Sequence, residues 1–400
     1  MPYRITILTG TRADWGILTP LAQALRNRTD VALSIVATNM HLSERHGMTV
    51  NEILRAGFAV DRRVPMPIVT DSPVERIHAM AQCMNGMANA LTELRPNAVI
   101  ILGDRFEMLA SASAAAMLRI PIIHIAGGTV SFGAVDDSIR HAITKLASLH
   151  LTETEEHRRR VVQMGEDPAR VVTCGALGVW NIMHRPLLTE DELAQALGGF
   201  RVTRDRTILA TYHPATLDNV PPADSFRQLL IALDRFPDHN VLFSGANNDA
   251  GGMAINAMIE VYAAANPTRV KAVKTLGMEL IISTMRHSAV FVGNSSSGIV
   301  EAPSAGIPTV DIGNRQAGRQ RAASVIHCPD DADSIEAAIR RALSPEMQEL
   351  AARRESPYYH ENTRTIMVDA IMRFLADLAD GHANKTFHDV DFACPPASSN

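Results

Sequence analysis

Two loops in the first half of the chain carry acids and bases in close succession. One loop follows an apolar run at residues 99–102 and holds Asp104 and Arg105. The other follows an apolar run at residues 120–123 and leads to Asp136. Loops at the carboxyl ends of parallel strands are where α/β proteins bind ligands, so we expect both loops to face one crevice. Carboxylates placed there can move protons.

A serine-rich segment in the second half has the composition of an anion site. Residues 294–298 read NSSSG, follow an apolar strand-like run and open a helix. The hydroxyls of Ser295 and Ser296, free backbone N–H groups and the helix dipole would converge on one spot, although such serines often only cap a helix. Glu301 lies one turn later and could accept hydrogen bonds from a ribose diol. This acid favours a nucleotide ligand.

Further polar residues follow other predicted strands. Arg12 follows the first strand, where its guanidinium could bind a phosphate in a forked geometry or pair with Asp14. His213 ends the first strand of the second half and precedes a proline, so it either faces the crevice or is a structural histidine. Asn247 follows the next strand, where an amide could recognise a base or a sugar.

Sequence motifs for common cofactors are absent. No G-x-G-x-x-G follows the first strand and no G-x-x-x-x-G-K-[ST] occurs, which disfavours a redox dinucleotide and a P-loop. The four cysteines lack C-x-x-C spacing, so neither a zinc site nor a disulfide framework is indicated. We expect no metal and no cofactor.

Apolar strand-like runs alternate with helical segments almost to the end of the chain, which predicts parallel sheets wrapped by helices. The 400 residues suit two domains of roughly 180 residues each. We therefore predict one α/β unit at residues 1–180, a second with C-terminal helices at 181–380, and a polar, disordered tail at 381–400. Strands are expected at residues 3–9, 31–38, 99–102, 120–123, 149–152, 170–174, 206–212, 240–244, 289–293 and 307–312.

The composition is that of a soluble globular protein. The net charge is −5, 46% of the residues are hydrophobic, and Lys and Arg form no long run, so a nucleic-acid partner is not expected. No apolar run approaches about 18 residues, which argues against a membrane span, and no signal peptide is recognised. We expect a cytoplasmic location.

Six segments, taken in this order and spacing, resemble the hydrolysing UDP-N-acetylglucosamine 2-epimerase family of the sialic- and legionaminic-acid pathways. They are GTRADWG, LGDRFE, GAVDDSIRHAITK, TYHP, ANNDAGG and GNSSSGIVEAPSAGIPTVDIGNRQAGR. The resemblance implies two Rossmann-like domains in a glycosyltransferase-B-like arrangement, with the active site in the cleft between them. It also implies a nucleotide-sugar substrate, no metal or redox cofactor, and a homodimer or homotetramer. The implied reaction eliminates the nucleoside diphosphate to a glycal, which is hydrated to a free N-acetylmannosamine-type sugar.

The resemblance carries roles onto particular residues. Asp104 and Asp136 match the catalytic acids, and His213 matches a histidine near the diphosphate. The residues that match substrate or nucleotide contacts, or stand beside them, are Arg12, Arg105, Asn247, Ser295, Ser296 and Glu301. Two further groups, His124 and Arg140, are expected to support the site, although Arg140 could simply form a helix pair with Asp136.

The chain departs from the family pattern at its centre. Members commonly place a carboxylate directly before or after the Gly-Gly pair, where this chain has Ala126 and Thr129. Glu107, Asp137 or water could take over the role of the absent acid. Trp180 stands in a loop where an aspartate is usual. Two other functions therefore stay open: a glycosyltransferase of the same fold, and a catalytically silent nucleotide-sugar-binding regulator.

Overall fold

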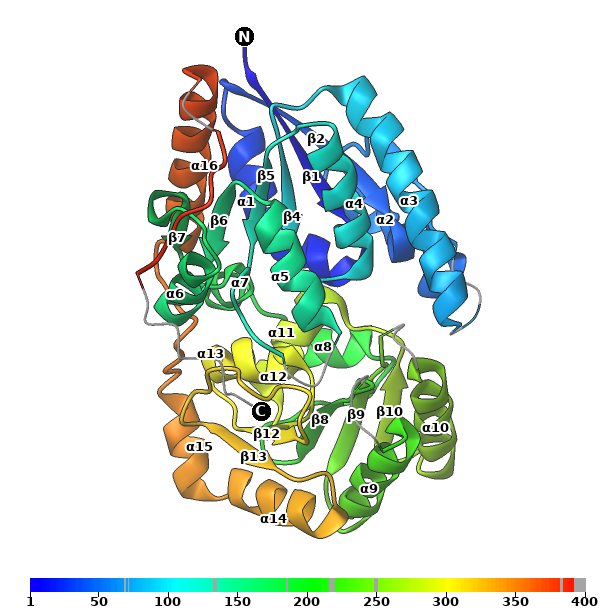
Figure 1. Cartoon of the computed structure of the whole chain (residues 1–400). Helices are drawn as coiled ribbons and strands as arrows, with labels where there is room; N and C mark the ends of the chain where they lie inside the picture. The colour runs from blue at the N-terminus through cyan, green and yellow to red at the C-terminus, as the bar shows by residue number, and fades with distance from the viewer. Residues whose placement is uncertain are drawn as a thin grey trace, which may run out of the picture.

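The computed structural model describes residues 1–67, 70, 72–131, 135–184, 186–215, 220–247, 251–381 and 384–391. The chain forms two parallel sheets, one above the other in Figure 1, with helices on both faces of each. The first has seven strands in the order β3-β2-β1-β4-β5-β6-β7, and the second has six in the order β10-β9-β8-β11-β12-β13. The predicted α/β class with two Rossmann-like units is confirmed. Of the tail predicted to be disordered, residues 381–400, the structure describes 381 and 384–391, where Lys385 pairs with Glu166 and the His388 N–H donates to the Gly165 carbonyl (2.9 Å). The other tail residues lie outside the described part.

The strands are short and consist mostly of buried apolar residues. The first sheet contains β1 (Tyr3–Thr9), β2 (Val31–Thr38), β3 (Arg62–Val64), β4 (Ala98–Leu102), β5 (Ile122–Ile125), β6 (Leu149–Thr152) and β7 (Val171–Thr173). The second contains β8 (Thr207–Thr211), β9 (Asn240–Ser244), β10 (Val270–Val273), β11 (Val290–Gly293), β12 (Thr309–Ile312) and β13 (Val325–Cys328).

The helices cover both faces of the two sheets. Around the first sheet they are α1 (Arg12–Arg26), α2 (Val50–Arg55), α3 (Pro73–Leu94), α4 (Phe106–Met117), α5 (Asp136–Leu146), α6 (Glu155–Gln163) and α7 (Leu177–His184). The next are α8 (Glu190–Ala196), α9 (Pro222–Asp234), α10 (Gly252–Ala265), α11 (Gly277–His287), α12 (Ser296–Val300), α13 (Ala302–Ala305), α14 (Ala332–Ala342), α15 (Pro345–Ala352) and α16 (Thr363–Ala379). Short 3-10 turns lie at Asn39–Leu42, Glu44–His46 and Pro168–Arg170.

Strand β4 illustrates why the central strands are apolar throughout. Side chains alternate between the two faces of a strand, and a parallel sheet is covered on both faces. Ile100 belongs to the core on one face, whereas Val99 and Ile101 belong to the core on the other. All three side chains are fully buried.

Each sheet has a point where the strand order reverses, and these points set the position of the site. In the first sheet β1 lies between β2 and β4, and in the second β8 lies between β9 and β11. Loops that leave neighbouring strands toward opposite faces of a sheet open a crevice at the carboxyl end. The loops after β1 and β4, and after β8 and β11, are therefore placed to form the walls of a binding cleft.

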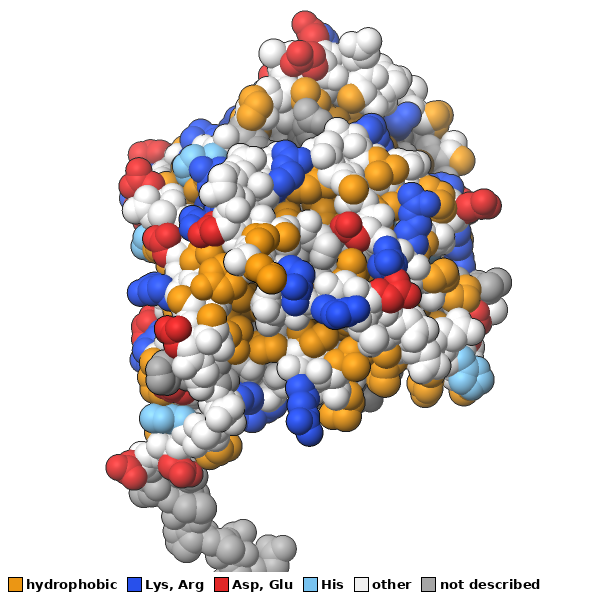
Figure 2. Space-filling model, turned by 90° about the horizontal axis from the view of Figure 1, so that it is seen from above, with side chains coloured by type: hydrophobic (Ala, Val, Ile, Leu, Met, Phe, Trp, Pro, Cys, Tyr) orange, Lys and Arg blue, Asp and Glu red, His pale blue; other side chains and the backbone are white. Residues whose placement is uncertain are grey.

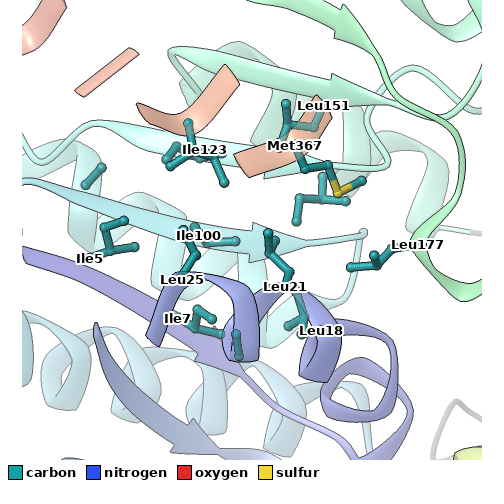
Figure 3. Packing of buried hydrophobic residues seen from close by; sticks show 14 of the residues in the cluster. Ile5, Ile7, Leu18, Leu21, Leu25, Ile100, Ile123, Leu151, Leu177 and Met367 are labelled. Carbon is teal, nitrogen blue, oxygen red and sulfur yellow. The ribbon is translucent and has the colours of Figure 1, made fainter. Parts of the chain in front are cut away.

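Helix α16 follows the second sheet in the sequence, but it packs on the first sheet. Met367, Ile371 and Phe374 belong to the same buried cluster as Ile5 and Ile100. Figure 3 shows Met367 close to Leu151 of β6. From the sequence we predicted that the second unit runs to residue 380, which would include α16. The apolar face of α16 is instead buried in the core of the first sheet, so this helix packs with the first unit.

In the part of the chain that the structure describes, no helix combines the length and apolar character needed to cross a membrane. On the face seen in Figure 2, Lys and Arg side chains are interspersed with Asp and Glu and with hydrophobic atoms. This face therefore presents no continuous basic surface.

The packing of α16 leads to a stability prediction. Phe374 is 2% exposed, so Phe374→Ala removes a buried ring and should lower the free energy of unfolding by about 3–5 kcal/mol. The neighbouring Arg373 is exposed, and Arg373→Ala should change it by less than about 0.5 kcal/mol. Urea denaturation followed by circular dichroism measures both. Equal effects would show that α16 is not part of the core.

Candidate active site

A cavity of about 1160 Å³ lies between the carboxyl ends of the two sheets. Its walls come from the loops after β1 and β4 on one side and after β8 and β11 on the other. Every residue that we predicted for the site lines this cavity: Arg12, Arg105, Asp104, Asp136, His213, Asn247, Ser295, Ser296 and Glu301. The structure thus brings together residues that are almost 300 positions apart in the sequence.

Arg140 of α5 organises the first half of the site. Its side chain is 1% exposed. One guanidinium nitrogen donates to Asp104 and to the Ser131 hydroxyl, and another donates to the Thr129 carbonyl (2.9 Å) and to Asp137 (3.2 Å). Arg140 therefore forms its ion pairs with Asp104 and Asp137, rather than the helix pair with Asp136 considered from the sequence.

The charges around Asp104 determine its protonation state. Burial by itself would raise the pKa of this carboxyl, but the guanidinium groups of Arg140 and Arg319 outweigh burial and hold the pKa below its usual range. Asp104 is consequently ionised at neutral pH. An ionised carboxylate that faces a cavity can accept a proton from a ligand.

Two arginines of the second half reach polar side chains of the first half. Arg319 lies in the loop after β12, and its Nη2 donates to the Ser131 hydroxyl (3.1 Å). Arg315 lies in the same loop, with its Nη2 3.9 Å from the carboxylate of Asp136, the first residue of α5. Neither arginine is among the residues predicted from the sequence, although both stand in the quoted segment GNRQAGR. Their roles depend on how the two halves meet.

Arg12 and Arg105 line the cavity while glutamates hold them in place. Arg12 pairs with Glu52 (2.6 Å) rather than with Asp14, which instead accepts from the backbone N–H groups at the start of α1. Arg105 pairs with Glu107 at 2.6 Å. Both guanidinium groups are thereby placed at the wall of the cavity.

The groups considered as substitutes for the absent family acid do not line the cavity. Glu107 is fully buried beneath Arg105, and Asp137 is bound to the Ser131 N–H and to Arg140. Thr129 does line it but brings no carboxylate.

His124 is a buried structural group. Its Nε2 lies 2.7 Å from the Gly103 carbonyl, and its Nδ1 lies 3.2 Å from the Thr144 hydroxyl. Burial lowers the pKa of His124 to about 4, so the ring is neutral and supports the loop that carries Asp104.

His213 is fixed by three hydrogen bonds to loops of the second half, two through its backbone and one through its ring. The Asn294 side chain accepts from the His213 N–H (2.7 Å) and donates to its carbonyl (2.8 Å). The ring Nδ1 accepts from the Asn247 N–H at 3.2 Å, which assigns the proton of the neutral ring to Nε2. The strands β11 and β8 approach closely at Gly293, which pairs with Thr211. Only glycine fits there, because its φ is +145° and any side chain would collide with the Thr211 carbonyl. The residues after Asn247 in the quoted segment, 248–250, lie outside the described part.

The serine-rich segment begins a short helix, as predicted. The Ser295 hydroxyl accepts from the Ser297 N–H and caps α12, which has five residues. Glu301 follows α12 at the cavity wall. Burial, and next the charge of Glu153, raise the pKa of Glu301 to about 7. Its Oε2 has no hydrogen-bond partner among the described residues, so a hydroxyl donor from a ligand would satisfy it.

One carboxylate of the cavity, Glu153, is not among the residues predicted from the sequence. It directly follows β6 and lines the cavity with its side chain 13% exposed. Its position after the expected strand at 149–152 was the available signal. In the described part of the chain no group of three or more His, Cys, Asp or Glu side chains is arranged to hold a metal ion.

Comparison with known proteins places this chain in a family. Residues 23–372 match the family described as UDP-N-acetylglucosamine 2-epimerase. The chain belongs to this family.

Similar members of the family come from several bacteria. The chain is 35% identical to the GDP/UDP-N,N'-diacetylbacillosamine 2-epimerase (hydrolyzing) of Campylobacter jejuni, over 81% of this chain and 83% of that protein. It is 32% identical to the polysialic acid biosynthesis protein P7 of Escherichia coli, over 97% of both. The structure of the UDP-GlcNAc 2-epimerase from Neisseria meningitidis bound to UDP-GlcNAc has a TM-score of 0.77 and 16% identity, and covers 92% of this chain and 100% of that one. The last similarity shows the fold alone.

The raised pKa of Glu301 predicts how stability depends on pH. In the unfolded chain this group ionises near its ordinary value of 4.5, but in the folded protein only near 7. Stability is therefore lost as the pH rises between these values, and Glu301→Gln should remove this loss. We expect the ligand-free variant to melt a few degrees above the parent protein at pH 8 and with a smaller difference at pH 5.

Differential scanning calorimetry measures both melting temperatures. The matched control is Glu349→Gln, because Glu349 is an exposed acid on α15. A gain at pH 8 that the control shares, or that persists unchanged at pH 5, would contradict a buried, proton-bearing Glu301.

Proposed function

We propose that this protein is a hydrolysing 2-epimerase that acts on a UDP-N-acetylglucosamine-type nucleotide sugar. The observation that carries the proposal is the ionised carboxylate of Asp104, which shares one cavity with His213 and the serine-rich segment of the opposite sheet. A base for the sugar and groups for a nucleoside diphosphate thus face each other. Relatives named as hydrolysing 2-epimerases support the same reaction.

The chemistry requires such a division between the two halves. The C2 proton of an N-acetylated sugar is only weakly acidic until the anomeric C–O bond begins to break. Elimination therefore needs stabilisation of the leaving diphosphate together with a base at C2. In our proposal Asp104 takes the C2 proton, and the electron pair of the breaking C1–O bond leaves with the diphosphate. Water then adds across the resulting C1=C2 bond and gives a free sugar with inverted C2.

The second sheet holds the nucleotide in this proposal. His213, Ser295 and Ser296 donate hydrogen bonds to the diphosphate, and Arg12 adds positive charge from the opposite wall. Glu301 accepts hydrogen bonds from the ribose hydroxyls, which suits the unpaired oxygen of its buried carboxylate.

The remaining predicted residues surround the sugar and the base. Asn247 contacts the nucleotide beside His213. Asp136 and Arg105 face the sugar, and Asp136 assists proton transfer next to Arg315. A free N-acetylmannosamine-type product would supply synthesis of nonulosonic acids or of a surface polysaccharide, in keeping with the name of one relative, the polysialic acid biosynthesis protein P7.

Incubation with UDP-N-acetylglucosamine, and separately with a UDP-linked diacetamido sugar, tests the proposal. We expect release of UDP and of a free sugar that is epimerised at C2 and carries deuterium there when the reaction runs in D₂O. Tight UDP binding without turnover of either sugar would instead identify a silent binding protein. UDP release that requires an added acceptor would identify a glycosyltransferase.

Asp104→Asn tests the assigned base. Turnover should fall by about 10²–10⁴-fold, because the amide cannot accept the proton. UDP affinity, measured by calorimetry, should change by less than about threefold, since the proposal gives Asp104 no contact with the nucleotide.

Asp137→Asn is the matched control for that variant. It also removes a carboxylate partner of the buried Arg140, but Asp137 does not line the cavity. We expect it to lose stability while keeping turnover within about tenfold of the parent protein. Asp104→Asn with most of its activity retained, or Asp137→Asn with the same loss, would show that Asp104 is not the base.

A further inference from the structure

The loop after β5 leaves a gap in the proton chemistry of the cavity. Ala126 and Thr129 flank the Gly-Gly pair there, and both line the cavity without an ionisable side chain. The elimination and the hydration each move a proton at C2, so two proton-handling groups with different pKa values are needed. In the proposed function Asp104 is the base of the elimination and Asp136 assists proton transfer, so the group that holds the proton for C2 of the intermediate is still to be assigned.

Glu153 enters the cavity from the neighbouring strand. It is the first residue after β6, which pairs in parallel with β5 through Ile125 and Leu151. Adjacent strands lie about 4.8 Å apart, so a long side chain after β6 reaches the space beside the loop after β5. Glu153 and Asp104 line the same cavity.

Glu153 has no structural ion pair that would account for its burial. Its closest basic neighbour is His157, whose Nδ1 is 3.7 Å from the carboxylate. Burial and the nearby arginines lower the pKa of His157 to about 3, so this ring carries no positive charge at neutral pH. No Lys or Arg of the described part lies within salt-bridge distance of Glu153. A largely buried carboxylate without a Lys or Arg at salt-bridge distance is costly, which points to a role in function.

The surrounding charges separate the two carboxylates. Burial raises the pKa of Glu153, the charges of Arg319 and Arg140 lower it, and Asp104 raises it, with a net shift above the ordinary value. The pKa of Asp104 is shifted below its ordinary value. Glu153 therefore keeps its proton to a higher pH than Asp104. This is the pattern of an acid and a base in one site.

We propose that Glu153 is a catalytic residue that protonates C2 of the glycal intermediate and thereby takes over the role of the acid absent from the loop after β5. The inference rests on the proposed function. In this step the Glu153 carboxyl transfers its proton to C2, and the oxygen of water bonds to C1. An O–H bond of that water breaks, and its proton passes to the Glu153 carboxylate. Glu153 thus ends the step as it began, while Asp104 releases the proton from the elimination to solvent.

Glu153→Gln tests this role, because glutamine has the same shape but cannot exchange the proton. The variant should still release UDP from the nucleotide sugar, and the accompanying product should be the glycal. Formation of the epimerised free sugar should fall by about 10²–10⁴-fold. Mass spectrometry and NMR of the products, together with a UDP assay, measure both outcomes, and circular dichroism with UDP calorimetry checks folding and binding.

Three comparisons make the result decisive. Asp104→Asn should lose UDP release itself, which separates the two steps. Glu155→Gln alters an exposed acid two residues away on α6 and should leave both rates within about twofold of the parent protein. Free sugar from Glu153→Gln at the parental rate, or equal loss of UDP and sugar with UDP binding intact, would overturn the assignment. A parent protein that releases neither UDP nor sugar would instead refute the proposed function.

Discussion

The buried guanidinium of Arg140 is the interaction on which the site depends. A charge with 1% exposure must be paired and hydrogen-bonded, and Arg140 meets this demand through two carboxylates, a hydroxyl and a carbonyl. The same bonds fix the loop after β4, which carries Asp104, to the segment that follows the Gly-Gly pair. Removing the charge would release both loops at once, so the positions of the acid and of the cavity wall are set by one residue.

The two halves of the protein are joined electrostatically at the same place. Arg319 crosses from the second sheet to Ser131, which also accepts from Arg140, so two cations share one hydroxyl beside Asp104. Arg315 faces Asp136 in a similar way. The cleft is thus lined by acids of the first half, such as Asp104 and Asp136, and by arginines of both halves, such as Arg12 and Arg315. In the proposed function, a diphosphate that enters it meets positive charge from both halves.

Burial acts on each acid of the cavity, yet the pKa values move in opposite directions. Desolvation raises the pKa of Asp104, Glu153 and Glu301 alike. Only beside Asp104 do the arginines outweigh it. At Glu153 and Glu301 burial prevails, with a further increase of the pKa from the charge of Asp104 at Glu153 and from that of Glu153 at Glu301, so both hold protons more tightly than exposed glutamates do. One cavity therefore contains an ionised carboxylate, Asp104, and two carboxyls whose pKa values are raised, that of Glu301 to about 7.

The sequence by itself determined the alternation of strands and helices, the parallel sheets and the list of polar residues that follow the strands, because these depend on local apolar patterns. It did not reveal β3, β10 and β13, which are short strands at or near the sheet edges. Each contains a polar or charged residue, as in the RRV of β3, and is a strand because it pairs with the neighbouring strand of the sheet. The sequence also could not show that α16 packs on the first sheet, that Arg140 forms an ion pair with Asp104, or that Glu153 and Arg319 line one cavity. Those facts depend on contacts between residues far apart in the chain, which only the tertiary structure brings together.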